Sequence, residues 1–451
     1  MPPERSRRYS GASARRRHIG DAPTEVIARV PPRHHRRTAR RPAPQRRFRR
    51  GLGRPLVALA SAAVLVGSGL AWGEAQHIVG GFHTSDVLAG APKSTGSAEN
   101  ILLIGLDSRK DRDGNDLPAS VLSALHAGDG EEGGYNTNTL ILVHVPADGQ
   151  HIVAFSIPRD DYVAVHGIDG YDHAKIKEAY GLMKAQAEQK LADEGVTDQA
   201  TLETDGRDAG RAETLQTVRE LTGVPIDRFA EVSLVGFYDI AKALGGVKVC
   251  LNHAVSDSYS GAHFSAGVHT LNASQALAFV RQRHGLDNGD LDRTHRQQAF
   301  LISVAHSLQS SGIFGDLDKL NALVTVAQRD IVLSSGWDIV DYAHRIGDIS
   351  GQNLAFRTLP VLRYDTVDNQ DVNIVDPAAI RSQVQTAFGI IPPQPAASAT
   401  RQLASTTDSS GSDTSGTDTP STDPADPTSQ DPAPDQGAPV VSTASGVPCV
   451  N

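Results

Sequence analysis

The feature that most constrains how this chain can fold is an uncharged run of seventeen residues, Leu56–Trp72. Its length is close to the minimum with which a helix crosses the hydrocarbon core of a bilayer. Residues 1–54 hold seventeen arginines against three acidic residues. Because positive charge favours the cytoplasmic side, the sequence predicts a transmembrane helix over 55–74, with the basic arm 1–54 in the cytoplasm and the rest of the chain outside the membrane.

A cleavable signal peptide is the alternative interpretation of this run, because small residues are abundant in it. The basic arm before it is much longer than the n-region of a signal peptide, so we predict an uncleaved signal anchor. The composition of the arm predicts disorder. A basic arm can also bind nucleic acid, but the apolar run that follows it favours a membrane, and we expect no nucleic-acid partner.

The two ends of the chain leave one central segment that can build a core. Residues 75–98 are expected to form a linker, and residues 392–451, which are mainly Ser, Thr, Asp, Pro and Gly, a disordered acidic tail. The folded domain is therefore predicted over 99–391. The chain has two cysteines, Cys250 and Cys449. In an exported chain they can form a disulfide, and the alternative at Cys250 is a buried free thiol.

Strand and helix patterns alternate within the predicted domain. Strands are expected at Glu99–Asp107, 139–145, 152–157, 229–235 and 247–251, and helices at 175–195 and 212–221. This alternation predicts an α/β (α+β) fold in which helices flank a mixed central sheet. One predicted strand ends at Asp107, with Arg109 just after it, and Arg159 follows another strand. Ligands of open α/β sheets bind at such strand ends.

The most polar part of the domain is Arg281–Gln298, with four arginines, three aspartates and two histidines in eighteen residues. Arg281 and Arg283 are spaced for one side of an extended segment, and Arg293 and Gln297 for one face of a helix. The planar fork of arginine suits bidentate contact with phosphate oxygens, so a diphosphate is the expected ligand. A solvated loop of Arg–Asp pairs is the alternative.

Six segments resemble the LytR-CpsA-Psr (LCP) family, in the same order. They are Asn100–Arg109, Asn138–Val145, Ser156–Asp160, Lys175–Tyr180, Gly245–Val247 and Arg281–Gln298. The resemblance covers about residues 99–305, and the long 110–135 segment is similar to the actinobacterial, mycobacterial-type branch. It implies an LCP-type catalytic domain and a cell-wall glycopolymer–peptidoglycan ligase. Such a transferase moves a polymer from polyprenyl pyrophosphate to a hydroxyl group of peptidoglycan, outside the membrane.

The resemblance also implies roles for individual residues. The pyrophosphate would be bound by Arg159, Arg281, Arg283, Arg293 and Gln297. Lys175 is a further candidate for contact with the phosphate, and the alternative is a lysine that only marks the start of a helix. Catalytic roles would fall to Asp107, Arg109, Asp290 and Asp292, of which Asp290 or Asp292 would orient an arginine or take the acceptor proton. Asp107 and Asn138 would hold Mg²⁺ (or Mn²⁺).

One position departs from the family pattern. Many members have Arg-Ser-Asp-Thr where this chain has Asn136-Thr137-Asn138-Thr139. An amide therefore replaces a carboxylate near the expected metal ion. Since Mg²⁺ prefers a few carboxylates together with phosphate oxygens, we expect weaker metal binding, completed by the substrate.

The resemblance implies a single-pass plasma-membrane protein that acts in cell-wall assembly on a lipid-linked glycan and peptidoglycan, with arabinogalactan as the polymer of this branch. Two alternatives remain open. One is a polyprenyl-pyrophosphate phosphatase, for which water is the acceptor. The other is a non-catalytic anchored protein that binds the lipid carrier or regulates wall assembly. The sequence has no Gly-x-Ser-x-Gly, Walker or His-Glu-x-x-His motif that would favour another chemistry.

Overall fold

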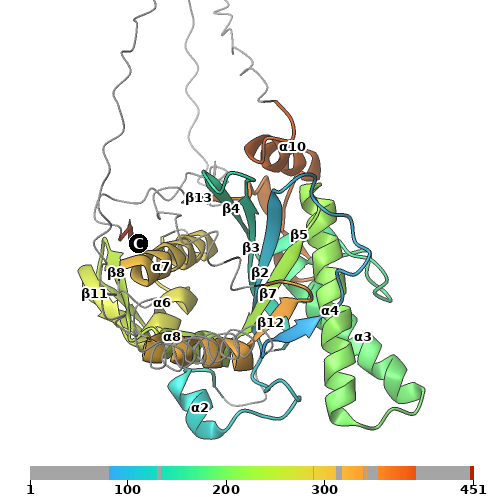
Figure 1. Ribbon diagram of the computed structural model, residues 1–451, viewed down its shortest axis with the longest axis horizontal. Helices are drawn as coiled ribbons and strands as arrows, with labels where there is room; N and C mark the ends of the chain where they lie inside the picture. Colours follow the sequence, from blue (N-terminus) through green and yellow to red (C-terminus); the bar gives the residue numbers. More distant parts are fainter. Residues whose placement is uncertain are drawn as a thin grey trace, which may run out of the picture. The chain divides into compact units, whose positions relative to one another are not determined.

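A mixed sheet of seven strands forms the centre of the fold in the computed structural model (Figure 1). Its strand order is β1 (His83–Ser85), β12 (Ile331–Ser334), β7 (Arg228–Ser233), β2 (Glu99–Asp107), β3 (Asn136–Val145), β4 (Ile152–Ile157) and β13 (Leu354–Thr358). β2 runs parallel to β7 and antiparallel to β3. The structure describes residues 81–128, 134–287, 289–310, 317–338, 342, 354–392 and 447–451. The predicted mixed sheet is confirmed.

Helices cover both faces of this sheet, and Figure 1 shows α3 and α4 on one side and α6, α7 and α8 on the other. The first side carries α3 (Ala179–Asp193), α4 (Gln199–Thr222) and α10 (Pro377–Ala387), and the second carries α5 (Leu234–Ala243), α6 (Ala273–Arg281), α7 (Asp290–Ser310) and α8 (Leu317–Asp330). A sheet buried on both faces needs apolar side chains on both, which is why its strands are nearly continuous apolar runs.

The sheet separates two hydrophobic cores. Leu102 and Ile104 of β2 are fully buried in the core that includes Leu215 of α4. The neighbouring Leu103 packs on the opposite face, against the cluster that includes Ile302 of α7. Because successive residues of a strand point to opposite faces, one strand serves both cores.

Helix α4 is much longer than predicted, and it packs through buried ion pairs as well as apolar residues. Arg211 donates two hydrogen bonds to Glu231 of β7, at 2.8 and 3.0 Å. Glu203 accepts from Arg207 at 2.6 Å and lies 2.9 Å from Lys184 of α3. These buried charges are paired, so the helix can lie against the sheet despite its polarity.

Three smaller sheets border the central one. They are β14 (Arg363–Val367), β15 (Gln370–Ile374), β5 (Asp161–Ala164) and β6 (His173–Lys175); β11 (Gly267–Leu271), β8 (Val247–Leu251) and β16 (Cys449–Val450); and β10 (Ala262–Phe264) with β9 (Val255–Asp257). The short helices η1 (Ile176–Glu178) and α2 (Ala119–Ala124) complete the elements used below.

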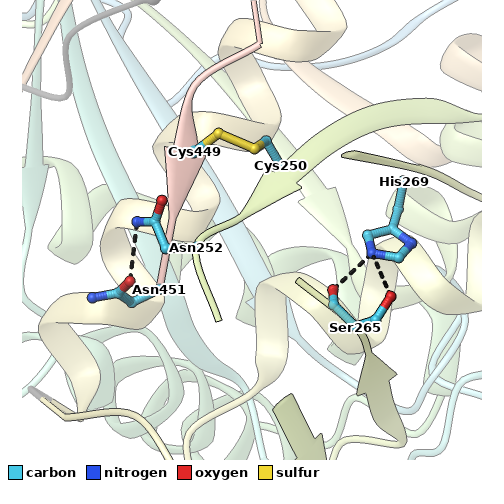
Figure 2. The surroundings of a disulfide bond; sticks show 6 residues. All are labelled: Cys250, Asn252, Ser265, His269, Cys449 and Asn451. Carbon is cyan, nitrogen blue, oxygen red and sulfur yellow. Dashed lines mark hydrogen bonds between the residues drawn. A yellow bond between two sulfur atoms is a disulfide. The ribbon is translucent and has the colours of Figure 1, made fainter. Parts of the chain in front are cut away.

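Two predicted boundaries of the folded domain are wrong. Within the expected linker 75–98, β1 forms an edge of the sheet by pairing with β12, and Leu88 is buried in the core. Within the expected tail 392–451, β16 pairs with β8 and Cys449 forms a disulfide with Cys250 (Figure 2). The free-thiol alternative is thereby excluded.

The predicted arm 1–54 and transmembrane helix 55–74 lie outside the described residues, as do residues 393–446 of the tail. Among the helices that the structure describes, none is both long enough and apolar enough to cross a membrane.

Candidate active site

A cavity of about 610 Å³ lies between the central sheet and the layer of α5, α6 and α7. Its body is apolar and is lined by residues such as Leu103, Ile141, Phe237, Leu277 and Phe300. These side chains come from β2, β3 and all three helices. A cavity of this size and lining suits an apolar ligand that the surrounding elements enclose.

Five arginines line the same cavity, from segments that are far apart in the sequence. Arg109 follows β2, Arg159 follows β4, Arg281 ends α6, Arg283 lies in the next loop and Arg293 is in the first turn of α7. The structure thus brings together eight of the predicted site residues: Asp107, Arg109, Asn138, Arg159, Arg281, Arg283, Arg293 and Gln297.

Asp290 gathers three of these arginines although it does not itself line the cavity. Its Oδ1 lies 3.1 Å from Nη2 of Arg293, 3.3 Å from Nε of Arg159 and 3.8 Å from Nε of Arg283. Asp290 is the first residue of α7, where the helix dipole favours a negative charge. One carboxylate therefore orients guanidinium groups from three segments.

The cluster remains short of negative charge. Five guanidinium groups and Lys177 face four carboxylates, those of Asp107, Asp160, Asp257 and Asp290. Arg159 and Arg293 are 7% and 4% exposed, and the Nε of each has no hydrogen-bond acceptor within the described residues. Burial, together with the charge of Arg159, lowers the pKa of Arg293 to about 10, against the opposing effect of Asp290. An anion with several oxygens would satisfy these donors.

Asn138 connects the aspartate of this site to an arginine. Its Nδ2 donates to Oδ2 of Asp107 at 2.8 Å, and its Oδ1 accepts from Nη1 of Arg159 at 2.7 Å. The pairing of β2 with β3 shifts by one residue here, so that Gly105 faces Thr139 and the next residue faces Thr137. Such a bulge gives Asn138 no partner in the ladder and directs its side chain into the site.

The predicted metal site has a limited set of ligands. Among the described residues, no group of three or more His, Cys, Asp or Glu could hold a metal ion. Asp107 lines the cavity with a side chain that is 21% exposed; its Oδ1 lies 3.5 Å from Nη1 of Arg109, and its Oδ2 accepts from Asn138. The oxygen of Asn138 is occupied by Arg159. Since Mg²⁺ commonly binds through one or two carboxylates plus substrate phosphates, these residues fit an ion that arrives with a phosphate.

The segment after α2 forms a wall that the sequence did not reveal. Nε of Arg109 donates to the carbonyl of Ala127 at 2.7 Å. Nη1 of Arg281 donates to the carbonyls of Leu125 and His126, at 2.9 and 3.1 Å. The last carbonyl groups of a helix have no hydrogen-bond donor within the helix. Here two arginines donate to the carbonyl at the end of α2 and to the two carbonyls that follow it. Every residue has a backbone carbonyl, so the sequence does not indicate which carbonyls will accept hydrogen bonds from the arginines.

Two predicted site residues lie elsewhere. Lys175 ends β6 and does not line the cavity. Its near neighbour Lys177, which the sequence analysis missed, donates to Asp160 at 2.6 Å, and Asp160 lies 3.3 Å from Arg159. Asp292 is also off the cavity, and its Oδ1 lies 3.9 Å from His295. Asp292 is two residues after Asp290 in α7, so its side chain points to the other side of the helix.

The chain is similar to a known protein family and to several known proteins. A model of the LytR_cpsA_psr family matches residues 78–388. The chain is 39% identical over 350 residues to the cell wall biosynthesis protein LcpA of Corynebacterium glutamicum. The aligned region covers 76% of this chain and 66% of that protein. It is 28% identical over 236 residues to the polyisoprenyl-teichoic acid–peptidoglycan teichoic acid transferase TagU of Bacillus licheniformis. This aligned region covers 52% of this chain and 66% of that protein.

The chain thus spans just under two thirds of the length of each of these two relatives. Among solved structures, the crystal structure of B. subtilis TagV is similar with a TM-score of 0.46 at 20% identity, over 66% of this chain and 100% of that chain.

The bridge through Asn138 predicts the effect of Asn138→Asp. The new carboxylate would keep its contact with Arg159, but it would lose the hydrogen bond to Asp107 and repel that carboxylate. Because the contact with Arg159 offsets part of this loss, the metal-free protein should lose only about 1 kcal/mol and unfold at a slightly lower temperature. Mg²⁺ would relieve the repulsion, and it should raise the melting temperature of the variant more than that of the wild type. Thermal unfolding with and without Mg²⁺ measures both, with Asn321→Asp, at an exposed position of α8, as the control. A Mg²⁺ shift no larger than in the wild type would contradict this placement.

The charge imbalance predicts different results for two buried arginines. Arg293→Gln removes one of several crowded like charges, so the free energy of unfolding should stay within about 1 kcal/mol of the wild type, while inorganic pyrophosphate no longer raises the melting temperature. Arg211→Gln leaves Glu231 buried without its partner, and it should cost about 3–5 kcal/mol but preserve the pyrophosphate shift. The same shift in both variants would remove Arg293 from the anion site.

Proposed function

Because the chain belongs to the LytR-CpsA-Psr family, we propose that it is a phosphotransferase that moves a cell-wall glycopolymer from a polyprenyl-pyrophosphate carrier to a hydroxyl group of peptidoglycan. The observation that carries the proposal is the cavity, in which an apolar body ends at five arginines. A polyprenyl pyrophosphate has the matching form, an apolar chain ending in a diphosphate. The resemblance to the actinobacterial branch makes arabinogalactan the proposed polymer.

The reaction requires stabilisation of charge more than covalent help from the protein. The acceptor oxygen attacks the phosphorus that bears the sugar, the bond from that phosphorus to the bridging oxygen breaks, and polyprenyl phosphate leaves while the hydroxyl proton is released. Negative charge spreads over the phosphate oxygens in such transition states. Buried donors that are already in place stabilise it without further reorganisation. The Nε groups of Arg159 and Arg293 are such donors, because neither makes a hydrogen bond among the described residues, although the former lies 3.3 Å from Asp160 and Asp290.

Two carboxylates have separate roles in this proposal. Asp107 would hold a Mg²⁺ ion, which when bound would neutralise charge on the phosphates. Asp290 positions Arg159, Arg283 and Arg293. Asp290 does not line the cavity, and its Oδ1 is engaged by three guanidinium groups, so we assign it the positioning of these arginines. Asp292 lies off the cavity, so neither of the two predicted candidates is proposed as the base.

We also propose that the protein is a single-pass plasma-membrane protein whose catalytic domain lies outside the cytoplasm. The uncharged run Leu56–Trp72 and the basic arm before it support this orientation. The disulfide between Cys250 and Cys449 gives independent support, since structural disulfides persist in oxidising compartments and are rare in the cytoplasm. The lipid carrier and the cell wall are both accessible from that side of the membrane.

An assay with the full chain in detergent tests the function. The protein is incubated with a polyprenyl-pyrophosphate-linked glycan and Mg²⁺, with and without peptidoglycan, and the lipid and wall products are measured by mass spectrometry. A transferase should release polyprenyl phosphate and attach the glycan to peptidoglycan through a phosphodiester. Equal release without peptidoglycan would indicate a phosphatase instead, and binding without any release would indicate a non-catalytic carrier-binding protein.

Because Asp290 contacts three arginines of the site, its substitution should change kcat without lowering the affinity for the lipid pyrophosphate. Asp290→Asn removes negative charge from the site, so the affinity for the lipid pyrophosphate should not fall. The three arginines lose their common partner, and kcat should fall by at least about tenfold, since misplaced groups lose transition-state stabilisation. Asp287→Asn, an exposed position in the same segment, is the control. An unchanged kcat, or a loss confined to affinity, would contradict the positioning role.

A further inference from the structure

Tyr259 is the most exposed large hydrophobic residue in the described part of the chain, at 76%, and it lines the cavity. Its ring lies against the imidazole of His284, with ring centroids 4.3 Å apart and planes tilted by 32°. His284 also lines the cavity, and its side chain is 63% exposed. Two aromatic rings therefore stand together at the open end of the site.

A buried carboxylate holds this pair in place. Asp257 is 4% exposed and accepts from the backbone N–H of Tyr259 at 2.9 Å and from the hydroxyl of Ser260 at 2.8 Å. These bonds fix the turn between β9 and β10. Oδ1 of Asp257 also lies 3.6 Å from Nδ1 of His284. The rings are exposed on backbone that is anchored, which is the arrangement of a preorganised contact surface.

The pair of rings directly adjoins the arginine cluster. Arg283 precedes His284 in the chain, and its backbone N–H points to Oδ2 of Asp257 at 3.4 Å. Its Nε lies 3.8 Å from Oδ1 of Asp290, the carboxylate that gathers the arginines. A diphosphate bound to these arginines would lie next to the two rings. A group attached to this diphosphate, or a molecule that approaches it from solvent, would therefore contact Tyr259 and His284.

We propose that Tyr259 and His284 form a subsite for a pyranose ring of a glycan; this deepens the proposed function and rests on it. A sugar has an apolar face of C–H groups and a polar rim of hydroxyl groups. An exposed aromatic ring can cover the apolar face while the hydroxyl groups stay hydrated, and Tyr combines a large apolar surface with a polar tip. The ring belongs either to the first sugar on the lipid-linked donor or to the acceptor glycan.

An exposed tyrosine alone would not support a subsite, because single exposed apolar residues are ordinary. Tyr171 and Tyr364 are also exposed, at 47% and 48%, but neither lines the cavity. Tyr259 differs because it is paired with a second ring, anchored by a buried carboxylate and placed beside the arginines. Tyr171 therefore provides a matched control.

Binding to the full chain in detergent tests the subsite with three probes. They are a polyprenyl pyrophosphate without sugar, the same lipid bearing one N-acetylglucosamine, and a soluble disaccharide fragment of peptidoglycan. Tyr259→Ala should weaken the binding of a sugar-containing probe by roughly threefold to tenfold, the range of aromatic contacts. Tyr259→Phe should keep the wild-type affinity, because the ring is retained. Tyr171→Ala should change nothing.

The pattern of losses identifies the source of the sugar. A loss for the sugar-bearing lipid, with the sugar-free lipid unchanged, assigns the donor, and a loss for the disaccharide alone assigns the acceptor. Unchanged binding of all probes to Tyr259→Ala would overturn the subsite, as would an equal loss for both lipids. If the wild type fails to bind even the sugar-free lipid, the proposed function fails first, and the disaccharide arm still reports on Tyr259.

Discussion

The structure depends on holding like charges together in a partly buried site. Arg159, Arg283 and Arg293 come from three segments, and one carboxylate, Asp290, lies within salt-bridge distance of each. Removing guanidinium groups from water is unfavourable unless nearby negative charges offset the lost hydration. Asp290 supplies part of this counter-charge, and the Nε groups of Arg159 and Arg293, which make no hydrogen bond among the described residues, leave donors for an anion that supplies the rest. The central sheet and the start of α7 are the rigid elements that keep this arrangement in the absence of ligand.

The same protein contains a second group of buried arginines that is organised differently. Arg211 makes two hydrogen bonds to Glu231, and Arg207 is bonded to Glu203, so these charges are matched within α4 and the sheet. No cavity residue belongs to that network. Pairing therefore distinguishes charges that support the fold from charges that await a ligand. The apolar body beside the unmatched group adds the second requirement, because it suits a hydrocarbon chain and not a free anion.

Local sequence patterns predicted many of the helices and strands and several site residues. The features that were missed depend on contacts between segments that are distant in the sequence. Asp107 and Arg159 were found because each follows an apolar strand, where α/β proteins place ligands. Asn138 enters the site through a bulge, which depends on the pairing of two strands. The first half of α4 was missed because its buried face carries Glu203 and Arg207 where periodicity expects apolar residues. Lys175 was preferred over Lys177 on motif alone, although Lys177 contacts Asp160.

The most direct test of this account is an experimental structure of the full chain with a polyprenyl pyrophosphate bound. The account predicts that phosphate oxygens accept hydrogen bonds from Arg159 and Arg293, at about 2.7–2.9 Å, while the polyprenyl chain lies between the sheet and α5–α7. A diphosphate bound away from these arginines, or a chain that leaves the apolar cavity empty, would contradict it.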